Sequence, residues 1–240
     1  MNAQAATVAA AASAPILLRE DIEDVAILTL NRPQARNSLS EATLEALGDA
    51  LTAIARDRSV RAVIIAANGP AFSAGHDLKE LNQRRSDADR GRTYFKHIMG
   101  MCSGVMQQVV TLPQPVIAAV QATATAAGCQ LVASCDLAVA SRNAKFATPG
   151  VNIGLFCSTP MVALSRAVPR KPAMEMLLTG EMIGAPQARD WGLVNRVVPE
   201  AQLESETIRL AKQIAAKSPL VLKIGKEAFY RQAELGLAEA

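Results

Sequence analysis

The stretch ATAAGCQLVASCD, residues 124–136, decides the fold. It begins with small residues, continues as an apolar segment, and carries no charged side chain before Asp136. Small side chains at the start of an apolar helix allow another part of the backbone to come unusually close. The stretch therefore predicts a tight turn into a buried helix. Another segment of the chain is expected to pack closely against this turn.

The segment directly before this stretch predicts a buried strand. QPVIAAV, at 114–120, is apolar on both faces, which is typical of a strand in a parallel sheet that is covered on both sides. Other segments read as strands in the same way or by their β-branched content. They are ILLRE (16–20), VAILTLN (25–31), RAVIIAA (61–67) and DLAVAS (136–141).

Helical patterns lie between and after these strands. Ser40 is suited to cap the N-terminus of a helix over 41–57, whose leucines and isoleucine fall on one face. A longer helix is expected over 87–110. Helical patterns dominate after Gly150, and those over 201–240 predict a C-terminal helical layer that is incomplete. Because strands alternate with helices, the chain is predicted to be an α/β protein with one core domain over 15–200.

Composition excludes several classes of function. The chain has 240 residues, of which 50% are apolar and 3% aromatic, with a net charge of +3. This length is enough for one well-buried domain. The weak net charge and the scarcity of aromatic residues argue against nucleic-acid binding, and no apolar run approaches the roughly 20 residues of a membrane span.

The cysteines and the N-terminal segment indicate the cellular compartment of the protein. Cys102, Cys129, Cys135 and Cys157 lack the spacing of a metal site, so we expect buried free thiols rather than disulfides or a zinc site. The Ala-rich segment 1–14 carries no positive charge, which a targeting peptide requires. We therefore expect a disordered tail and a cytoplasmic protein.

Two small-residue turns point to a ligand. FSAGH (72–76) and ATAAG (124–128) each follow a fully apolar strand, and ligands bind at the carboxyl ends of parallel strands. Free main-chain N–H groups at such turns attract negative charge, and two of them facing one point would form an oxyanion hole. The alternative is that the small residues only allow a helix to pack closely on a strand. Neither turn matches a nucleotide-binding glycine loop.

Four ordered motifs resemble the crotonase superfamily, which includes enoyl-CoA hydratases and isomerases. They are FSAGHDLKEL (72–81), QPVIAAVQATATAAGCQLVASCDLAVAS (114–141), KFATPGVNIGL (145–155) and AMEMLLTGEMIGAPQARDWGLVNRVVP (173–199). LNRPQARNSLS (30–40) fits as well, and the resemblance covers residues 15–235. It implies a spiral of β-β-α units with a C-terminal helical layer, a homotrimer or a hexamer built from two trimers, and a role in fatty acid metabolism.

The resemblance also implies a ligand and a site. The ligand is an acyl-CoA thioester, with no cofactor or metal beyond the coenzyme A of the substrate. The main-chain N–H groups of His76 and Ala127 correspond to the family's oxyanion hole. The acyl-CoA pocket corresponds to Ala35, Arg36, Asn37, Ala74, Asp77, Leu78, Phe156, Cys157 and Ser158.

The chain departs from the family at both catalytic glutamates. Gln130 and Gly150 stand at their positions. A glutamine amide can orient a water or a carbonyl, but it does not titrate. Since each general acid–base group contributes roughly 10²–10⁴-fold in rate, we expect most hydration by the usual mechanism to be lost. We also expect the double change Gln130→Glu with Gly150→Glu to raise hydration of crotonyl-CoA.

Three functions remain open at this stage. The first is a hydratase-like lyase, the second an acyl-CoA thioesterase, and the third a protein that binds acyl-CoA without turning it over. A thioesterase would use Cys157 or Ser158 as nucleophile, whereas the alternative is that Ser158 or Thr159 caps the following helix. His76 is a candidate general base, although the family uses only its main-chain amide.

Overall fold

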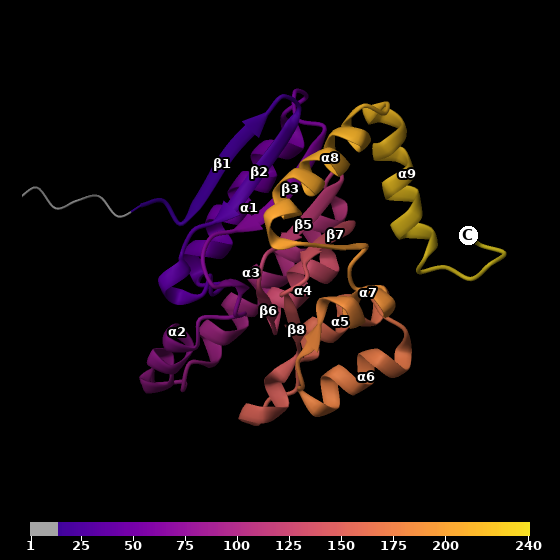
Figure 1. Cartoon of the computed structure of the whole chain (residues 1–240). Helices are drawn as coiled ribbons and strands as arrows, with labels where there is room; N and C mark the ends of the chain where they lie inside the picture. The colour runs from indigo at the N-terminus through magenta and orange to yellow at the C-terminus, as the bar shows by residue number, and fades with distance from the viewer. Residues whose placement is uncertain (1–13) are drawn as a thin grey trace, which may run out of the picture.

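The computed structural model describes residues 14–240, so the predicted tail lies outside the described residues except for Ala14. A six-stranded sheet, in the order β1-β2-β3-β5-β7-β10, forms the centre (Figure 1). All its neighbouring pairs are parallel except the hairpin of β1 and β2. Its strands are β1 (Leu17–Ile22), β2 (Val25–Leu30), β3 (Ala62–Ala67), β5 (Val116–Val120), β7 (Leu137–Ser141) and β10 (Arg196–Val198).

A second sheet runs beside the first. Shortly after β3, β5 and β7 the chain forms one short strand each, and these three pair in parallel, while a fourth closes the sheet antiparallel. Each long strand, short strand and following helix makes one β-β-α unit of the predicted spiral, which is confirmed. The short strands are β4 (Ala71–Ser73), β6 (Thr123–Thr125), β8 (Lys145–Ala147) and β9 (Ile183–Gly184).

Helices cover both faces of the central sheet. On one face α8 packs against β3, β5 and β7, and on the other α1 and α3 join the main core cluster. Ser40 caps α1 as predicted, because its hydroxyl accepts a hydrogen bond from Thr43 N at 3.2 Å. No helix within residues 14–240 is long and apolar enough to cross a membrane. The helices are α1 (Glu41–Arg56), α2 (Leu78–Gln83), α3 (Arg92–Thr111), α4 (Ala127–Ser134), α5 (Ser158–Ala167), α6 (Arg170–Thr179), α7 (Ala185–Asp190), α8 (Leu203–Ala215) and α9 (Pro219–Gln232).

The long helix expected over 87–110 begins later than predicted. Arg90 and Gly91 both have left-handed backbone, with φ of 57° and 83°, so α3 starts at Arg92. The preceding residues instead form a turn after the short helix α2. This turn places α2 beside α3 at the carboxyl end of β3.

The last helix, α9, contacts the core through polar groups. It has no buried residue, and it lies at the upper right edge of the molecule, ahead of the C-terminus (Figure 1). Lys226 Nζ lies 2.7 Å from Asp136 Oδ2, and Tyr230 OH donates to Asp136 Oδ1 at 2.8 Å. Asp136 Oδ2 also accepts from Val116 N at 2.7 Å, so one carboxylate joins α9 to the start of β5.

Candidate active site

The first small-residue turn lies between β4 and α2. Gly75 has φ of 87°, a conformation that glycine adopts without strain. Ala74 N donates to Arg36 O at 3.0 Å, and Leu39 N donates to Gly75 O at 2.8 Å. The predicted neighbourhood of the 35–39 loop and the turn at 74–76 is therefore present.

The second turn, between β6 and α4, contains strained backbone. Ala126 has φ of 51° and ψ of −121°, a region that residues with a Cβ rarely occupy, at a cost of roughly 1–3 kcal/mol. Its N–H donates to Ala147 O at 3.0 Å, which ties the turn to β8. Such strain at the start of a helix is typical of a functional site.

The two turns touch, and this contact explains the small residues of 124–128. A Cβ placed on Gly128 would lie 2.3 Å from Ser73 O, and a Cβ placed on Gly75 would lie 3.1 Å from Ala127 N. The end of β4 is therefore what comes close to the start of α4. The main-chain N–H groups of His76 and Ala127 have no hydrogen-bond partner within residues 14–240, so the contact brings two free donors together.

The positions of the two family glutamates differ in their surroundings. Gln130 lies in the first turn of α4, is 6% exposed, and its Oε1 has no hydrogen-bond partner in the described part of the chain. Gly150 is closed off, because a Cβ there would lie 2.7 Å from Leu155 O and 2.9 Å from Cys157 Sγ. A glutamate at 150 would require the loop between Gly150 and Cys157 to shift, so the gain predicted for the double change Gln130→Glu with Gly150→Glu depends on that movement.

The loop at 156–158 is arranged differently from either reading of the sequence. Cys157 is buried, and its Sγ accepts from Gly150 N at 3.3 Å. Ser158 is the first residue of α5, with its hydroxyl 3.3 Å from Phe156 O. No side chain caps α5, so the prediction that Ser158 or Thr159 does so is wrong.

Two residues assigned to the acyl-CoA pocket have structural roles. Asn37 is 1% exposed: its Oδ1 accepts from Arg32 N, and its Nδ2 donates to the carbonyls of Asn68 and Ala71, all at 2.8 Å. The Asn37 side chain therefore has no polar atom left for a ligand. Asp77 caps α2 through Lys79 N and accepts from the Ser38 hydroxyl at 2.8 Å.

The charge state of Asp77 follows from these contacts. Partial burial opposes ionisation, but the hydrogen bonds from Ser38 and from main-chain N–H groups, together with the charge of Arg32, hold the pKa of Asp77 below its usual value. Asp77 is therefore an ionised capping group, and its lowered pKa makes it a weak base.

The imidazole of His76 is neutral at physiological pH, because burial lowers its pKa. Both of its ring nitrogens are buried without a partner in the described residues. The other histidine, His97, lies on the surface of α3 and pairs with Glu41 at 3.1 Å. Nowhere in residues 14–240 do three or more His, Cys, Asp or Glu side chains gather as a metal site would need.

An apolar cavity of about 420 Å³ adjoins α2. It lies between α2, α3 and the segment that follows Gly150, and it includes Leu78, which the sequence assigned to the acyl-CoA pocket. Pockets of this size and character are typical of small-molecule sites. The lining residues are Leu78, Leu81, Asn82, Arg85, Phe95, Met99, Ile153 and Leu155.

The four cysteines are free and buried, as predicted, and burial makes them poor nucleophiles. Burial raises the pKa of the Cys102 and Cys129 thiols to about 12 and raises that of Cys157 as well. We expect all four thiols of the native protein to react with a disulfide reagent at pH 8 at least roughly 100-fold more slowly than in guanidinium. One fast thiol in the native protein, mapped to Cys157, would contradict this expectation.

Comparisons with known proteins show the family of the chain. The profile of the enoyl-CoA hydratase/isomerase family matches residues 20–240. The human protein named enoyl-CoA hydratase domain-containing protein 3, mitochondrial, is 50% identical over 219 residues, which cover 91% of this chain and 71% of that protein. The enoyl-CoA hydratase of Pongo abelii, also named mitochondrial, is 33% identical over 216 residues, 90% of this chain and 72% of that protein.

A solved structure has a sequence identity to this chain close to that of the human relative. The enoyl-CoA hydratase of Mycobacterium smegmatis superposes with a TM-score of 0.88 at 53% identity, covering 94% of this chain and 86% of that one. The mitochondrial names of the vertebrate relatives conflict with the cytoplasmic location that was expected from the N-terminal segment. That expectation is wrong, because it rested on the few residues before Arg19 rather than on any property of the folded domain.

Proposed function

Because the chain belongs to the enoyl-CoA hydratase/isomerase family, we propose that it binds an acyl-CoA thioester and holds the thioester oxygen between the main-chain N–H groups of His76 and Ala127. The observation that carries this proposal is the contact between the two turns, which leaves both donors without a partner within residues 14–240. A donor placed in this way typically contributes about 3–4 kcal/mol to an oxyanionic transition state.

The cavity between α2 and α3 is the proposed site of the acyl chain. The cavity between α2 and α3 begins at Leu78, two residues after His76. Leu78, Ile153 and Leu155 are each more than half exposed, although they line this cavity. Covering them with an acyl chain would remove their apolar surface from water, which stabilises the complex by about 25 cal/mol per Å² buried.

Turnover is expected to be a slow, hydratase-type addition of water. Gln130 and Gly150 carry no titratable group, and Asp77 is a capping group. The amide of Gln130 can orient a water but cannot transfer a proton, and the neutral imidazole of His76 is a weak base because its pKa is lowered. Cys157 is not favoured as the nucleophile of a thioesterase, since burial raises its pKa and disfavours a thiolate.

We expect Gln130→Glu alone to raise hydration of crotonyl-CoA by at least about tenfold. A glutamate there would be buried in the first turn of α4. Burial would raise its pKa toward neutrality, while the helix dipole would still stabilise the negative charge of its carboxylate. The measurement is mass spectrometry of crotonyl-CoA after incubation with protein at stoichiometric concentration. Gln107→Glu, with the same charge change on the exposed surface of α3, is the matched control.

The outcomes separate the possibilities. A gain of one water that is faster in Gln130→Glu, and unchanged in Gln107→Glu, supports the proposal. A variant that binds crotonyl-CoA but hydrates it no faster than the parent contradicts the role given to position 130. If the parent does not bind crotonyl-CoA at all, the proposed function itself is wrong.

A further inference from the structure

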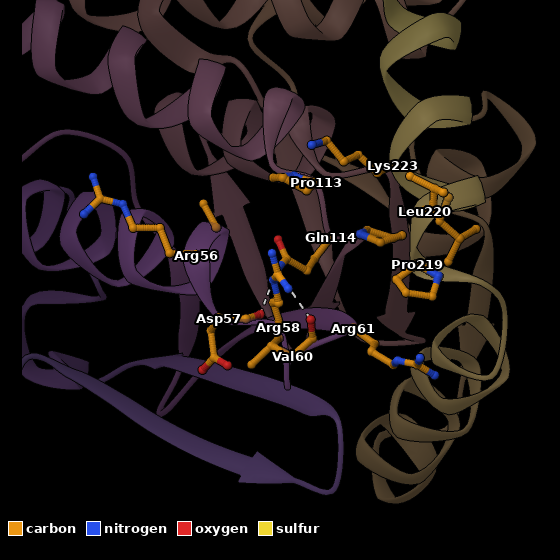
Figure 2. Close-up of a pocket in the computed structure, with 13 residues that line it drawn as sticks. Arg56, Asp57, Arg58, Val60, Arg61, Pro113, Gln114, Pro219, Leu220 and Lys223 are labelled. Carbon is orange, nitrogen blue, oxygen red and sulfur yellow. Dashed lines mark hydrogen bonds between the residues drawn. The ribbon is translucent and has the colours of Figure 1, made fainter.

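A second large pocket lies at the opposite end of the sheet from the proposed thioester site. Its volume is about 690 Å³, and it opens between the turn that precedes β3, the turn that precedes β5, and the first turn of α9 (Figure 2). The thioester site follows the carboxyl ends of the same strands. Since a six-residue strand spans about 20 Å, the two sites are separated by about the length of a strand.

Positive charge dominates this pocket. Four cationic residues line it, namely Arg56, Arg58, Arg61 and Lys223, against the single carboxylate of Asp57. That carboxylate is already engaged by Ser59 and, at 3.1 Å, by Arg19. The hydrogen bonds from Ser59, followed by that from Arg19, hold the pKa of Asp57 below its usual value. Asp57 therefore stays ionised and paired, and it leaves the four cations without a counter-ion.

None of these four cations forms an ion pair with a residue that the structure describes. Arg56, Arg58 and Lys223 are exposed, and Arg61 donates only to the Ala215 carbonyl, at 3.2 Å. Several cations around one concave surface attract an anion more strongly than the same charges spread over a flat one. Guanidinium and ammonium groups bind phosphate through strong charge-assisted hydrogen bonds.

Gln114 adds a hydrogen-bond acceptor to the same pocket. It is 9% exposed, and its Nε2 donates to the carbonyl of Ile54 at 2.8 Å and lies 3.3 Å and 3.4 Å from those of Asp57 and Val60. These contacts fix the orientation of the amide, and Figure 2 shows it turned toward the 57–60 segment. Gln114 Oε1 has no partner among the described residues. A buried acceptor of this kind calls for a donor that a bare phosphate group does not offer.

The remaining walls are apolar. Val60, Pro113, Pro115, Pro219 and Leu220 line the pocket between the cations. A ligand that fits must therefore combine an anionic group, a hydrogen-bond donor and an apolar or ring-shaped body. Inorganic phosphate has no apolar or ring-shaped body.

We propose that this pocket is a second ligand site, for a small organic phosphate that carries its own hydroxyl or amino donors, as a nucleotide does. The phosphate lies among Arg58, Arg61 and Lys223, and a ligand hydroxyl or amino group donates to Gln114 Oε1. The site is independent of the proposed thioester chemistry, because it shares no residue with the turns at 74–76 and 126–128.

The test is calorimetric titration of the full chain with ADP, with pyrophosphate, and with anionic phospholipid vesicles. We expect saturable binding of one ADP per chain and weaker binding of pyrophosphate, which lacks the donor. The double variant Arg58→Gln with Lys223→Gln should weaken ADP binding at least about tenfold. The matched control is Arg170→Gln with Lys171→Gln, which removes two exposed cations from α6 and should leave ADP binding unchanged.

Three results would overturn the proposal. The first is an absence of ADP binding by the parent, whether or not it binds vesicles, since vesicle binding alone assigns the cations to a lipid surface. The second is ADP binding that the Arg58/Lys223 variant retains in full, which would place ADP elsewhere, for example at the thioester site. The third is an equal loss in the Arg170/Lys171 control, which would mean that only net charge matters.

Discussion

Replacing Gly128 by alanine is expected to lower the free energy of unfolding by about 3 kcal/mol and to abolish binding of crotonyl-CoA. The added Cβ would lie 2.3 Å from Ser73 O and 2.7 Å from Ser73 Cβ. Both are far inside van der Waals contact. Relief would require β4 and the start of α4 to separate, and that separation moves the N–H groups of His76 and Ala127 apart.

Neighbouring structure prevents an easy shift of either partner. Ser73 is fully buried in β4, which pairs with β6, and the chain enters α4 directly from β6 through the strained Ala126. Moving the Ser73 carbonyl away from position 128 therefore disturbs the same short sheet that positions the second turn. Overpacking in so constrained a place costs more than at a site that can expand.

Gly104→Ala is the matched control for this substitution. Gly104 lies in the middle of α3 and a Cβ there meets nothing within 4 Å, so alanine should stabilise the protein by up to about 1 kcal/mol through helix propensity. Guanidinium denaturation of both variants, followed by crotonyl-CoA titration at a temperature where each is folded, gives the comparison. If Gly128→Ala is as stable as Gly104→Ala, or binds crotonyl-CoA like the parent, the contact between the turns does not have the role assigned to it.

The main sheet could be predicted from the sequence because its strands are long enough to show a pattern. The segments 61–67 and 114–120 are apolar at nearly every position, which only a covered parallel strand explains. The short strands β4, β6 and β8 have three residues each, too few for any periodicity to appear. The second sheet was therefore implied only by resemblance to the family.

The sequence could predict the parts of the site that depend on main-chain geometry. It could not predict the parts that depend on how the loops pack. The turns with His76 and Ala127 come together because β4 and β6 pair, a consequence of the fold. The role of Asn37 depends on carbonyls 31 and 34 residues away in sequence, and the closure of Gly150 depends on how the loop to Cys157 folds back. Contacts of this kind leave no local sequence signal.

The second large effect is expected from Lys226→Met, which should release α9 from the core. The Lys226 side chain is 9% exposed, and its ammonium lies 2.7 Å from Asp136 Oδ2, with the carbonyls of Val109 and Gln114 at 3.1 Å and 3.2 Å. Removing one partner of a buried ion pair typically costs about 3–5 kcal/mol, because the other charge remains without compensation. Since α9 has no buried residue to hold it, undocking this helix relieves that cost more easily than unfolding the domain.

Hydrogen exchange by mass spectrometry distinguishes undocking from global unfolding. In Lys226→Met, peptides from 219–232 should lose protection while those of β3 and β5 keep it, because Asp136 still accepts from Val116 N and the sheet core is unchanged. Tyr230→Phe should weaken the docking of α9 by a smaller amount, about 1.5–3 kcal/mol, through the loss of one hydrogen bond to a charged group.

Glu234→Gln is the control at the far end of the same segment. It breaks the pair of Glu234 with Arg166, whose side chains are 60% and 57% exposed, and an ion pair so open to solvent contributes little to stability. Exchange in 219–232 should therefore stay close to that of the parent. If Glu234→Gln and Lys226→Met reduce the exchange protection of 219–232 equally, α9 is held by surface charge in general. If Lys226→Met leaves this protection unchanged, the apolar contacts of α9 suffice without the Asp136 carboxylate.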